Sequence, residues 1–158
     1  MKRAVTLTIN GEAISSEIEP RTTLVDFLRE DVMLTGTHVG CEHGVCGACS
    51  VLLDGTPIRS CLLFAIQAEG HEVTTVEGLV EEDGSLGLLQ DSFWETHAMQ
   101  CGYCTPGMLI AAYGLLAESA DPTEAEIREA ISGNLCRCTG YVQIVDAVRL
   151  AAARMRQQ

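Results

Sequence analysis

The sequence predicts an α+β fold in which a β-rich N-terminal half, residues 1–78, precedes an all-α half, residues 79–158. Strand and hairpin patterns dominate the first half, whereas helical periodicity and helix caps dominate the second. The eight cysteines divide in the same way, with a set of four in each half. A hydrophobic core alone gives domains of this size limited stability, so bound metal has a structural use in both halves.

The N-terminal half is expected to open with a β-hairpin and a short helix. Apolar residues alternate along the first strand, at Val5, Leu7 and Ile9. Asn10-Gly11 then supplies a two-residue hairpin turn, with a second strand after it. Beyond Thr22-Thr23, the spacing of the apolar residues is that of one helix face. We expect a second strand pair around the turn at Asp54-Gly55, and a further strand over residues 71–76.

The C-terminal half is expected to be a bundle of helices. A linker is predicted at residues 81–84, where glycine and acidic residues gather. Two of the helix starts carry proline and capping residues, in Thr105-Pro106 and in Asp121-Pro122-Thr123-Glu124. The predicted helices cover residues 87–97, 106–118, 123–132 and 142–155.

Charge and composition exclude several classes of protein. The formal net charge of -12 and the sequence pI near 4.6 oppose binding to nucleic acid or to anionic membrane surfaces. No apolar run approaches the roughly 20 residues of a membrane span, and the first residues lack the pattern of a signal peptide. We therefore expect a cytoplasmic protein, in which cysteines serve as metal ligands more often than as disulfides.

The first cysteine set has the spacing of a plant-type [2Fe–2S] cluster. It reads C-x4-C-x2-C, with a fourth cysteine after eleven further residues, and consists of Cys41, Cys46, Cys49 and Cys61. Gly40, Gly44 and Gly47 lie among these cysteines, where the lack of a Cβ lets backbone N–H groups approach anionic sulfur. A structural zinc site is the main rival, although zinc sites usually use two C-x2-C pairs. His43 does not indicate a Rieske centre, because four cysteines are already present.

The second cysteine set combines a C-x2-C pair with a C-x-C pair. Cys101 and Cys104 precede the helix predicted from residue 106, and Cys136 and Cys138 lie between two predicted helices. The positive end of a helix dipole beside the first pair favours an anionic group. The pattern alone leaves open a [2Fe–2S] cluster, a zinc ion or a redox disulfide.

Three motifs together resemble a known family. GCEHGVCGACSVLLDG with a following SCL, QCGYCTPGM and GNLCRCTGY occur in the order and spacing of the small iron–sulfur subunit of molybdenum hydroxylases. These enzymes include xanthine dehydrogenase, aldehyde oxidoreductase and carbon monoxide dehydrogenase. The resemblance implies a β-grasp ferredoxin domain followed by a four-helix domain, each holding one [2Fe–2S] cluster.

The resemblance also implies a function and partners. In this family a large subunit binds a molybdopterin cofactor and oxidises the substrate, and a medium subunit binds FAD. The small subunit relays electrons from the molybdenum centre through its two clusters to FAD, in a heterotrimer or a dimer of heterotrimers. By similarity, Gln100 binds the pterin cofactor and Cys138 is the cluster ligand nearest to it, whereas substrate chemistry resides on a partner subunit and no residue here is catalytic.

Two other functions compete with this one. A freestanding ferredoxin-like carrier would not copurify with two larger chains, and it has little use for a second cluster in a helical domain. A non-redox zinc scaffold would be colourless, whereas [2Fe–2S] clusters are brown. The substrate of the complex is determined by another polypeptide.

Overall fold

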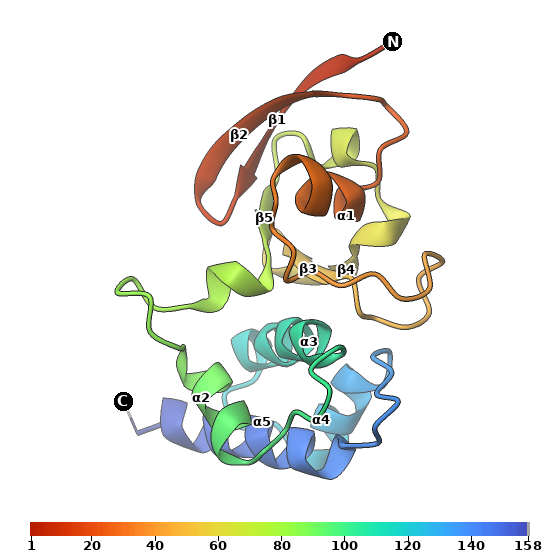
Figure 1. Ribbon diagram of the computed structural model, residues 1–158. Helices are drawn as coiled ribbons and strands as arrows, with labels where there is room; N and C mark the ends of the chain where they lie inside the picture. Colours follow the sequence, from red (N-terminus) through yellow and green to blue (C-terminus); the bar gives the residue numbers. More distant parts are fainter. Residues whose placement is uncertain (158) are drawn as a thin grey trace.

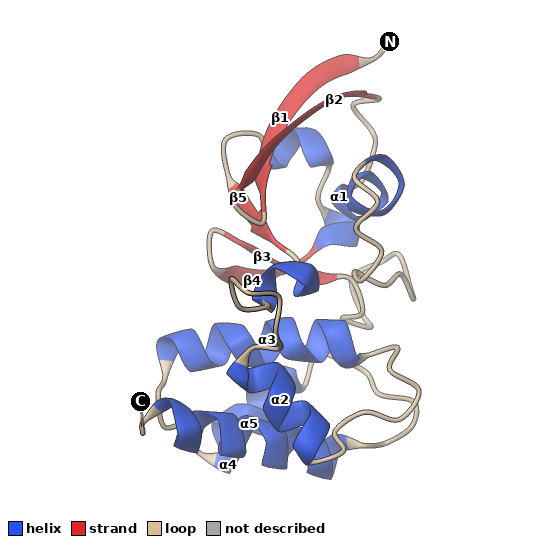
Figure 2. Ribbon diagram, turned by 60° about the vertical axis from the view of Figure 1, so that its left-hand side comes forward, coloured by secondary structure: helices blue, strands red, loops and turns tan. Residues whose placement is uncertain are grey.

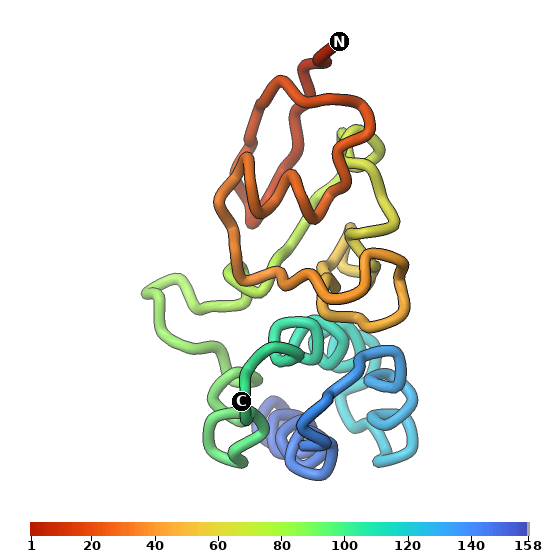
Figure 3. Tube along the Cα trace, turned by 45° about the vertical axis from the view of Figure 1, so that its right-hand side comes forward, coloured from red at the N-terminus to blue at the C-terminus, as the bar shows by residue number. Residues whose placement is uncertain are grey.

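The computed structural model describes residues 1–157 and consists of a sheet part and a helical part (Figure 1). We use "sheet part" for the elements from β1 to η4, and "helical part" for those from α2 to α5. Each part has a hydrophobic core of its own within the described residues. Figure 3 follows the chain out of the sheet part, through an extended loop after residue 79, and into the helical part.

The sheet part is built on a five-stranded sheet, counted over residues 1–157, with the strand order β2-β1-β5-β3-β4. The parallel pairing of β1 with β5 lies at its centre, and the other pairings are antiparallel. The strand bounds are Arg3–Ile9 for β1, Glu12–Ile18 for β2, Ser50–Leu53 for β3, Thr56–Arg59 for β4 and Glu72–Thr74 for β5.

Both predicted hairpins are confirmed, and their turns explain their register. Asn10 and Gly11 have φ of 50° and 82°, and Asp54 and Gly55 have φ of 49° and 80°. Positive φ at both central residues is the requirement of a type I′ turn, whose twist matches that of paired strands. The second turn matters for function, because it sends β4 back beside β3 and delivers the chain to Cys61.

The predicted helix after Thr23 is present but shorter in its regular part than the pattern suggests. Helix α1 covers Leu24–Asp26 and continues as a wider π-helical turn, η1, over Phe27–Asp31. Thr23 caps it, since its hydroxyl accepts a hydrogen bond from the backbone N–H of Asp26 at 3.2 Å. Short 3₁₀ turns complete the sheet part, η2 at Ser60–Leu62, η3 at Ala65–Ala68 and η4 at Val76–Leu79.

Among the described residues, the helical part contains the four predicted helices. Each helix begins and ends within about two residues of its predicted bounds. They are α2 at Leu88–Glu95, α3 at Thr105–Glu118, α4 at Glu124–Ile131 and α5 at Tyr141–Met155. Helix α4 is capped by Thr123, with Glu126 completing the capping box, whereas the sequence pattern indicated Asp121 as the cap and Pro122 as the first helical residue. The cap of α3 also differs, because α3 begins at Thr105 and Cys104 takes the N-cap position.

The two parts meet where α3 lies across β3 and β4 (Figure 2). Small residues on α3 permit this close contact. A Cβ on Gly107 would lie 2.3 Å from the carbonyl oxygen of Gly47, and one on Gly114 would lie 2.4 Å from the ring of Pro57. The packing brings the loop before β3 against the segment between α4 and α5, so that both cysteine sets lie at the junction between the parts.

None of the helices within residues 1–157 has both the length and the apolar character needed to cross a bilayer.

Candidate metal centres

The first centre is formed by the loop before β3 and the turn after β4. Cys41, Cys46 and Cys49 lie on the loop, and Cys61 lies in the 3₁₀ turn η2. The β3–β4 hairpin closes the distance between them, because Ser60 donates from both its backbone N–H and its hydroxyl to the carbonyl oxygen of Cys49, at 3.2 and 2.6 Å. All four cysteines of the predicted first set are thereby brought to one end of the sheet part.

The thiols of this centre are arranged in pairs. Cys46 lies close enough to Cys41, and Cys49 close enough to Cys61, to affect the pKa of the thiol beside it. The backbone N–H of Cys46 also points to the sulfur of Cys41, at 3.4 Å. A backbone donor aimed at sulfur is the arrangement that stabilises an anionic thiolate.

Two of the three loop glycines have the positive φ that the sequence suggested. Gly44 and Gly47 have φ of 83° and 76°, a region in which a Cβ is strained. Gly40 has an ordinary φ, and its role is space, because a Cβ there would lie 3.0 Å from the sulfur of Cys46. The loop therefore needs glycine at Gly44 and Gly47 for its backbone conformation and at Gly40 for its close approach to the Cys46 sulfur.

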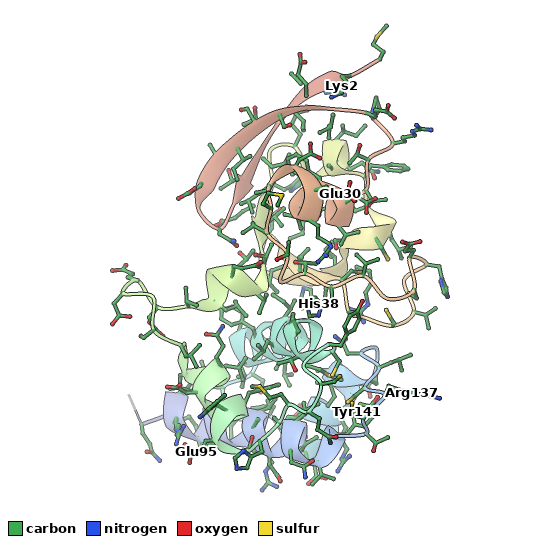
Figure 4. The ribbon with its side chains drawn as sticks, viewed as in Figure 1. Lys2, Glu30, His38, Glu95, Arg137 and Tyr141 are labelled. Atoms are coloured by element: carbon green, nitrogen blue, oxygen red, sulfur yellow. The ribbon has the colours of Figure 1, made fainter. Side chains whose placement is uncertain are left out.

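The second centre lies at one end of the helical part. Cys101 and Cys104 are at the start of α3, and Cys136 and Cys138 are between α4 and α5. The thiols of the two segments lie beside each other, Cys101 beside Cys138 and Cys104 beside Cys136. Tyr141, at the start of α5, orients the second segment by accepting the backbone N–H of Cys136 on its hydroxyl at 2.7 Å. Figure 4 shows Tyr141 and Arg137 on this same end of the molecule.

The thiol pKa values differ within the two centres. Backbone N–H donors of its own loop, chiefly that of His43, lower the pKa of Cys41 to about 6. Burial raises the pKa of Cys61 to about 11 and that of Cys104 to about 12. Metal binding must therefore displace protons from the latter two thiols, and it weakens as the pH falls.

The pairwise arrangement fits two irons in each centre. A [2Fe–2S] cluster has four thiolate ligands, two on each iron, which matches two thiol pairs per set. Among residues 1–157, no three or more His, Cys, Asp or Glu side chains are placed to hold one metal ion. Beside Cys104, the hydroxyl of Thr105 is buried and has no hydrogen-bond partner within the described chain, which leaves it free to donate to sulfur.

Gln100 and His43, which the sequence also singled out, lie beside the second and the first centre respectively. Gln100 is exposed, and its amide nitrogen is 3.4 Å from the position of a Cβ on Gly140, two residues after Cys138. His43 donates from Nδ1 to the carbonyl oxygen of Cys41, a bond that stays within the cysteine loop. Gln100 and Cys138 thus belong to the same end of the helical part.

The two centres are connected by hydrogen bonds that the sequence did not indicate. The backbone N–H of Leu135, next to Cys136, donates to the carbonyl oxygen of Cys46 at 2.9 Å. Tyr103 donates its hydroxyl to the carbonyl oxygen of Val39, and the ring of His38 stacks on that of Tyr103 with centroids 4.7 Å apart. His38 lies where the parts meet in Figure 4. A cavity of about 110 Å³ between the centres is lined by residues of both sets, among them Cys46, Cys104 and Cys136.

Exposed apolar side chains surround both centres. Val45 and Leu62 are 57% and 64% exposed beside the first, and Leu135 is 54% exposed beside the second. Trp94, on α2, is 68% exposed. Gathered apolar side chains of this kind mark surfaces that other proteins cover.

Comparison with known proteins gives matches over both parts. Residues 7–83 match the family described as "2Fe-2S iron-sulfur cluster binding domain", and residues 75–149 match the family described as "[2Fe-2S] binding domain". The chain is 56% identical to the caffeine dehydrogenase subunit gamma of Pseudomonas sp. (strain CBB1), over 92% of this chain and 88% of that protein. It is 51% identical to the nicotinate dehydrogenase small FeS subunit of Eubacterium barkeri, over 97% of each.

A solved structure shows the same fold. A chain of quinoline 2-oxidoreductase from Pseudomonas putida 86 superposes with a TM-score of 0.94 at 52% identity, over 99% of this chain and 97% of that one. The likeness covers the sheet part and the helical part together, and so includes their relative placement.

Proposed function

This chain belongs to the small iron–sulfur subunits of the molybdenum hydroxylase family, a family of electron-transfer subunits with two [2Fe–2S] clusters, and we propose from this premise how electrons cross it. They enter at the centre of Cys101, Cys104, Cys136 and Cys138, which faces a molybdopterin cofactor on a large partner subunit. They leave from the centre of Cys41, Cys46, Cys49 and Cys61 to FAD on a medium partner subunit. The chain thereby serves a dehydrogenase without carrying out its substrate chemistry.

The observation that carries this proposal is the hydrogen bond from the backbone N–H of Leu135 to the carbonyl oxygen of Cys46, at 2.9 Å. Each cluster, when bound, accepts and passes on one electron at a time. Leu135 adjoins Cys136 of one centre, and Cys46 is itself a proposed ligand of the other. A short covalent path interrupted by a single hydrogen bond therefore joins the two ligand sets, without a solvent gap.

The end of the helical part supplies the proposed entry point. Cys101 is exposed and Cys138 is half-buried, so this pair of ligands lies near the molecular surface. Gln100 is exposed beside them and offers an amide that can both donate and accept hydrogen bonds, as a pterin requires. The exposed Leu135 adds an apolar contact for the large subunit.

The exposed surface of the sheet part supplies the proposed exit. Val45 and Leu62 flank the first centre, and the side chain of Leu62 packs against Gly44 of the cysteine loop. A flavin subunit docked on these side chains would lie next to the first centre. The assembly that follows is a heterotrimer or a dimer of heterotrimers.

Two further features belong to the proposal. We assign residues 1–78 to the β-grasp ferredoxin domain and residues 79–158 to the helical domain, each with one cluster. The eight cysteines are all unpaired thiols by geometry, which suits a reducing compartment, and we place the complex in the cytoplasm.

The test is the order in which the clusters become reduced. The complex is purified from its host, mixed with its substrate, frozen at successive times, and examined by electron paramagnetic resonance. Cys104→Ser and Cys61→Ser variants identify which signal belongs to which centre. The signal of the second centre should appear first, and the reverse order would overturn the proposed direction. Copurification of two larger chains containing molybdenum and flavin separates this function from that of a lone carrier.

A further inference from the structure

Arg59 connects the two parts of the molecule from the end of β4. Its Nη1 donates to the hydroxyl of Ser50 at 2.6 Å, and its Nη2 donates to the carbonyl oxygen of Gly133 at 2.8 Å and to Oδ1 of Asn134 at 3.1 Å. One guanidinium thus bonds to β3 of the sheet part and to the segment just before Cys136. Arginine suits this task because its donors form a rigid planar fork.

Asn134 completes the connection from the other side. Its side chain is buried, with 2% exposed, and its amide nitrogen donates to the carbonyl oxygen of Gly47 at 3.2 Å. The hydroxyl of Ser50 donates to the same oxygen at 2.6 Å. Arg59, Ser50, Asn134 and Gly47 therefore form a closed ring of hydrogen bonds, which we call the Arg59 clamp.

The Arg59 clamp lies directly beside the contact between the centres. Gly47 follows Cys46, which accepts the hydrogen bond, and Asn134 precedes Leu135, which donates it. The clamp holds the residue next to each partner, so it fixes the separation of the two backbone segments. A Cβ on Gly133 would lie 2.6 Å from Nη2 of Arg59, so the guanidinium lies directly against the backbone at this glycine.

We propose that Arg59 is a positioning residue for electron transfer between the two centres, acting by holding the Leu135–Cys46 hydrogen bond closed. The inference rests on the assignment of the eight cysteines as cluster ligands. Its guanidinium bonds to a hydroxyl, a carbonyl and an amide, which are neutral acceptors, so its positive charge also favours the reduced, more negative state of the nearby centres.

Substitutions at Arg59 separate geometry from charge. Arg59→Met removes both the charge and the hydrogen bonds while keeping most of the length of the side chain. Arg59→Lys keeps the charge but has no planar fork to reach Ser50 and Gly133 together. Arg128→Met is the matched control, because Arg128 is an exposed arginine whose ion pair with Glu124 is confined to α4.

The experiment uses the purified complex and three measurements. Iron content tests the cysteine assignment by itself. Hydrogen exchange of the peptide containing Leu135 reports whether its hydrogen bond is held closed. Freeze-quench spectroscopy gives the rate of the first cluster reduction and, separately, the rate at which the electron passes between the clusters, whichever cluster is reduced first.

If the iron content is unchanged, Arg59→Met should raise the hydrogen-exchange rate of the Leu135 amide about tenfold or more. The reason is that the loss of charge-assisted hydrogen bonds lowers the free energy needed to open this contact by an amount that corresponds to such a factor. It should also slow the intercluster step and leave the first reduction at the parental rate. Arg59→Lys should slow the same step, because lysine keeps the charge but lacks the planar fork. An intercluster rate equal to that of Arg128→Met, or an equal loss in both steps, would overturn the inference. If Arg59→Met loses iron, the intercluster rate of Arg59→Lys decides whether the inference holds.

Discussion

Gly107 on α3 stands against the carbonyl oxygen of Gly47, at a distance where a Cβ on Gly107 would approach that oxygen to 2.3 Å. Gly47 lies between Cys46 and Cys49 in the first centre, and Gly107 lies three residues after Cys104 of the second. The start of helix α3 is therefore in direct contact with the loop of the other centre. The absence of one side chain permits the two centres to come this close.

This contact predicts that Gly107→Ala destabilises the protein, although alanine is the better helix former. The helix propensity gained is about 1 kcal/mol, whereas overpacking costs about 1–3 kcal/mol. The higher part of that range applies, because the oxygen of Gly47 is also held by Ser50 and Asn134 and cannot move aside. Thermal unfolding should show a lower midpoint for Gly107→Ala than for the parent.

Gly114→Ala is the graded comparison for this substitution. Its Cβ would meet the ring of Pro57 at 2.4 Å, on the edge strand β4, where the neighbour can shift more easily than a bonded backbone oxygen. The loss should be smaller than for Gly107→Ala. An unfolding midpoint for Gly107→Ala at or above that of the parent would show that helix α3 and the loop at Gly47 can move apart enough to accept a Cβ.

Local structure was predictable from the sequence, whereas the junction between the parts was not. The Asn10-Gly11 and Asp54-Gly55 turns act over a few residues, and both occur as expected, while the cap of α4 lies at Thr123, two residues after the expected Asp121. The bond from Arg59 to Gly133 spans 74 positions, and no periodicity or spacing encodes it. Asn134 reads as an ordinary turn residue, because its burial arises only when the two parts pack. The cysteine sets were predictable because their spacing reflects the geometry of the group that they bind.

The two thiol sets predict the metal content and its dependence on single ligands. The native subunit should contain about four irons and four acid-labile sulfides, because each set of four thiolates holds one two-iron cluster. Its reduced form should give two distinguishable paramagnetic signals. Iron and sulfide analysis with spin quantification checks both. Two irons accompanied by stoichiometric zinc would contradict the prediction.

Replacing one ligand should affect one centre. Cys61→Ser should deplete the first cluster and destabilise the sheet part, because metal binding contributes to the folding of small domains. The second cluster should remain, since its thiols come from the helical part alone. Cys104→Ser is the reciprocal variant and should remove only the second signal. Loss of both signals in each variant would argue against the division at residue 78.

Tyr103 predicts a second, weaker contribution to the contact between the parts. Tyr103→Phe removes its hydrogen bond to Val39 but keeps the ring stacked on His38 and the backbone oxygen that accepts from Nδ1 of His38 at 2.8 Å. A neutral hydrogen bond contributes about 0.5–1.5 kcal/mol, which for a chain of this length corresponds to a few degrees in the unfolding midpoint. Calorimetry should detect this loss, and Tyr113→Phe, on the exposed side of α3, should show none.

The entry of electrons depends, in our proposal, on Gln100. Gln100→Ala removes a side-chain amide beside Gly140 while leaving every thiol of the second centre in place, so both clusters should survive. The neutral hydrogen bond lost to the pterin is typically worth about 0.5–1.5 kcal/mol, enough to loosen the position of the cofactor without releasing it. Reduction of the clusters by substrate should therefore be slower, whereas reduction by dithionite, which bypasses the molybdenum centre, should be nearly unchanged. Stopped-flow measurements on the assembled complex give both rates.

Gln90→Ala, a glutamine substitution on α2 away from both cysteine sets, is the control and should leave both rates unaltered. If substrate reduces the Gln100→Ala complex at the parental rate with full cofactor occupancy, Gln100 does not position the pterin, and electron entry depends on the thiolate ligands without it.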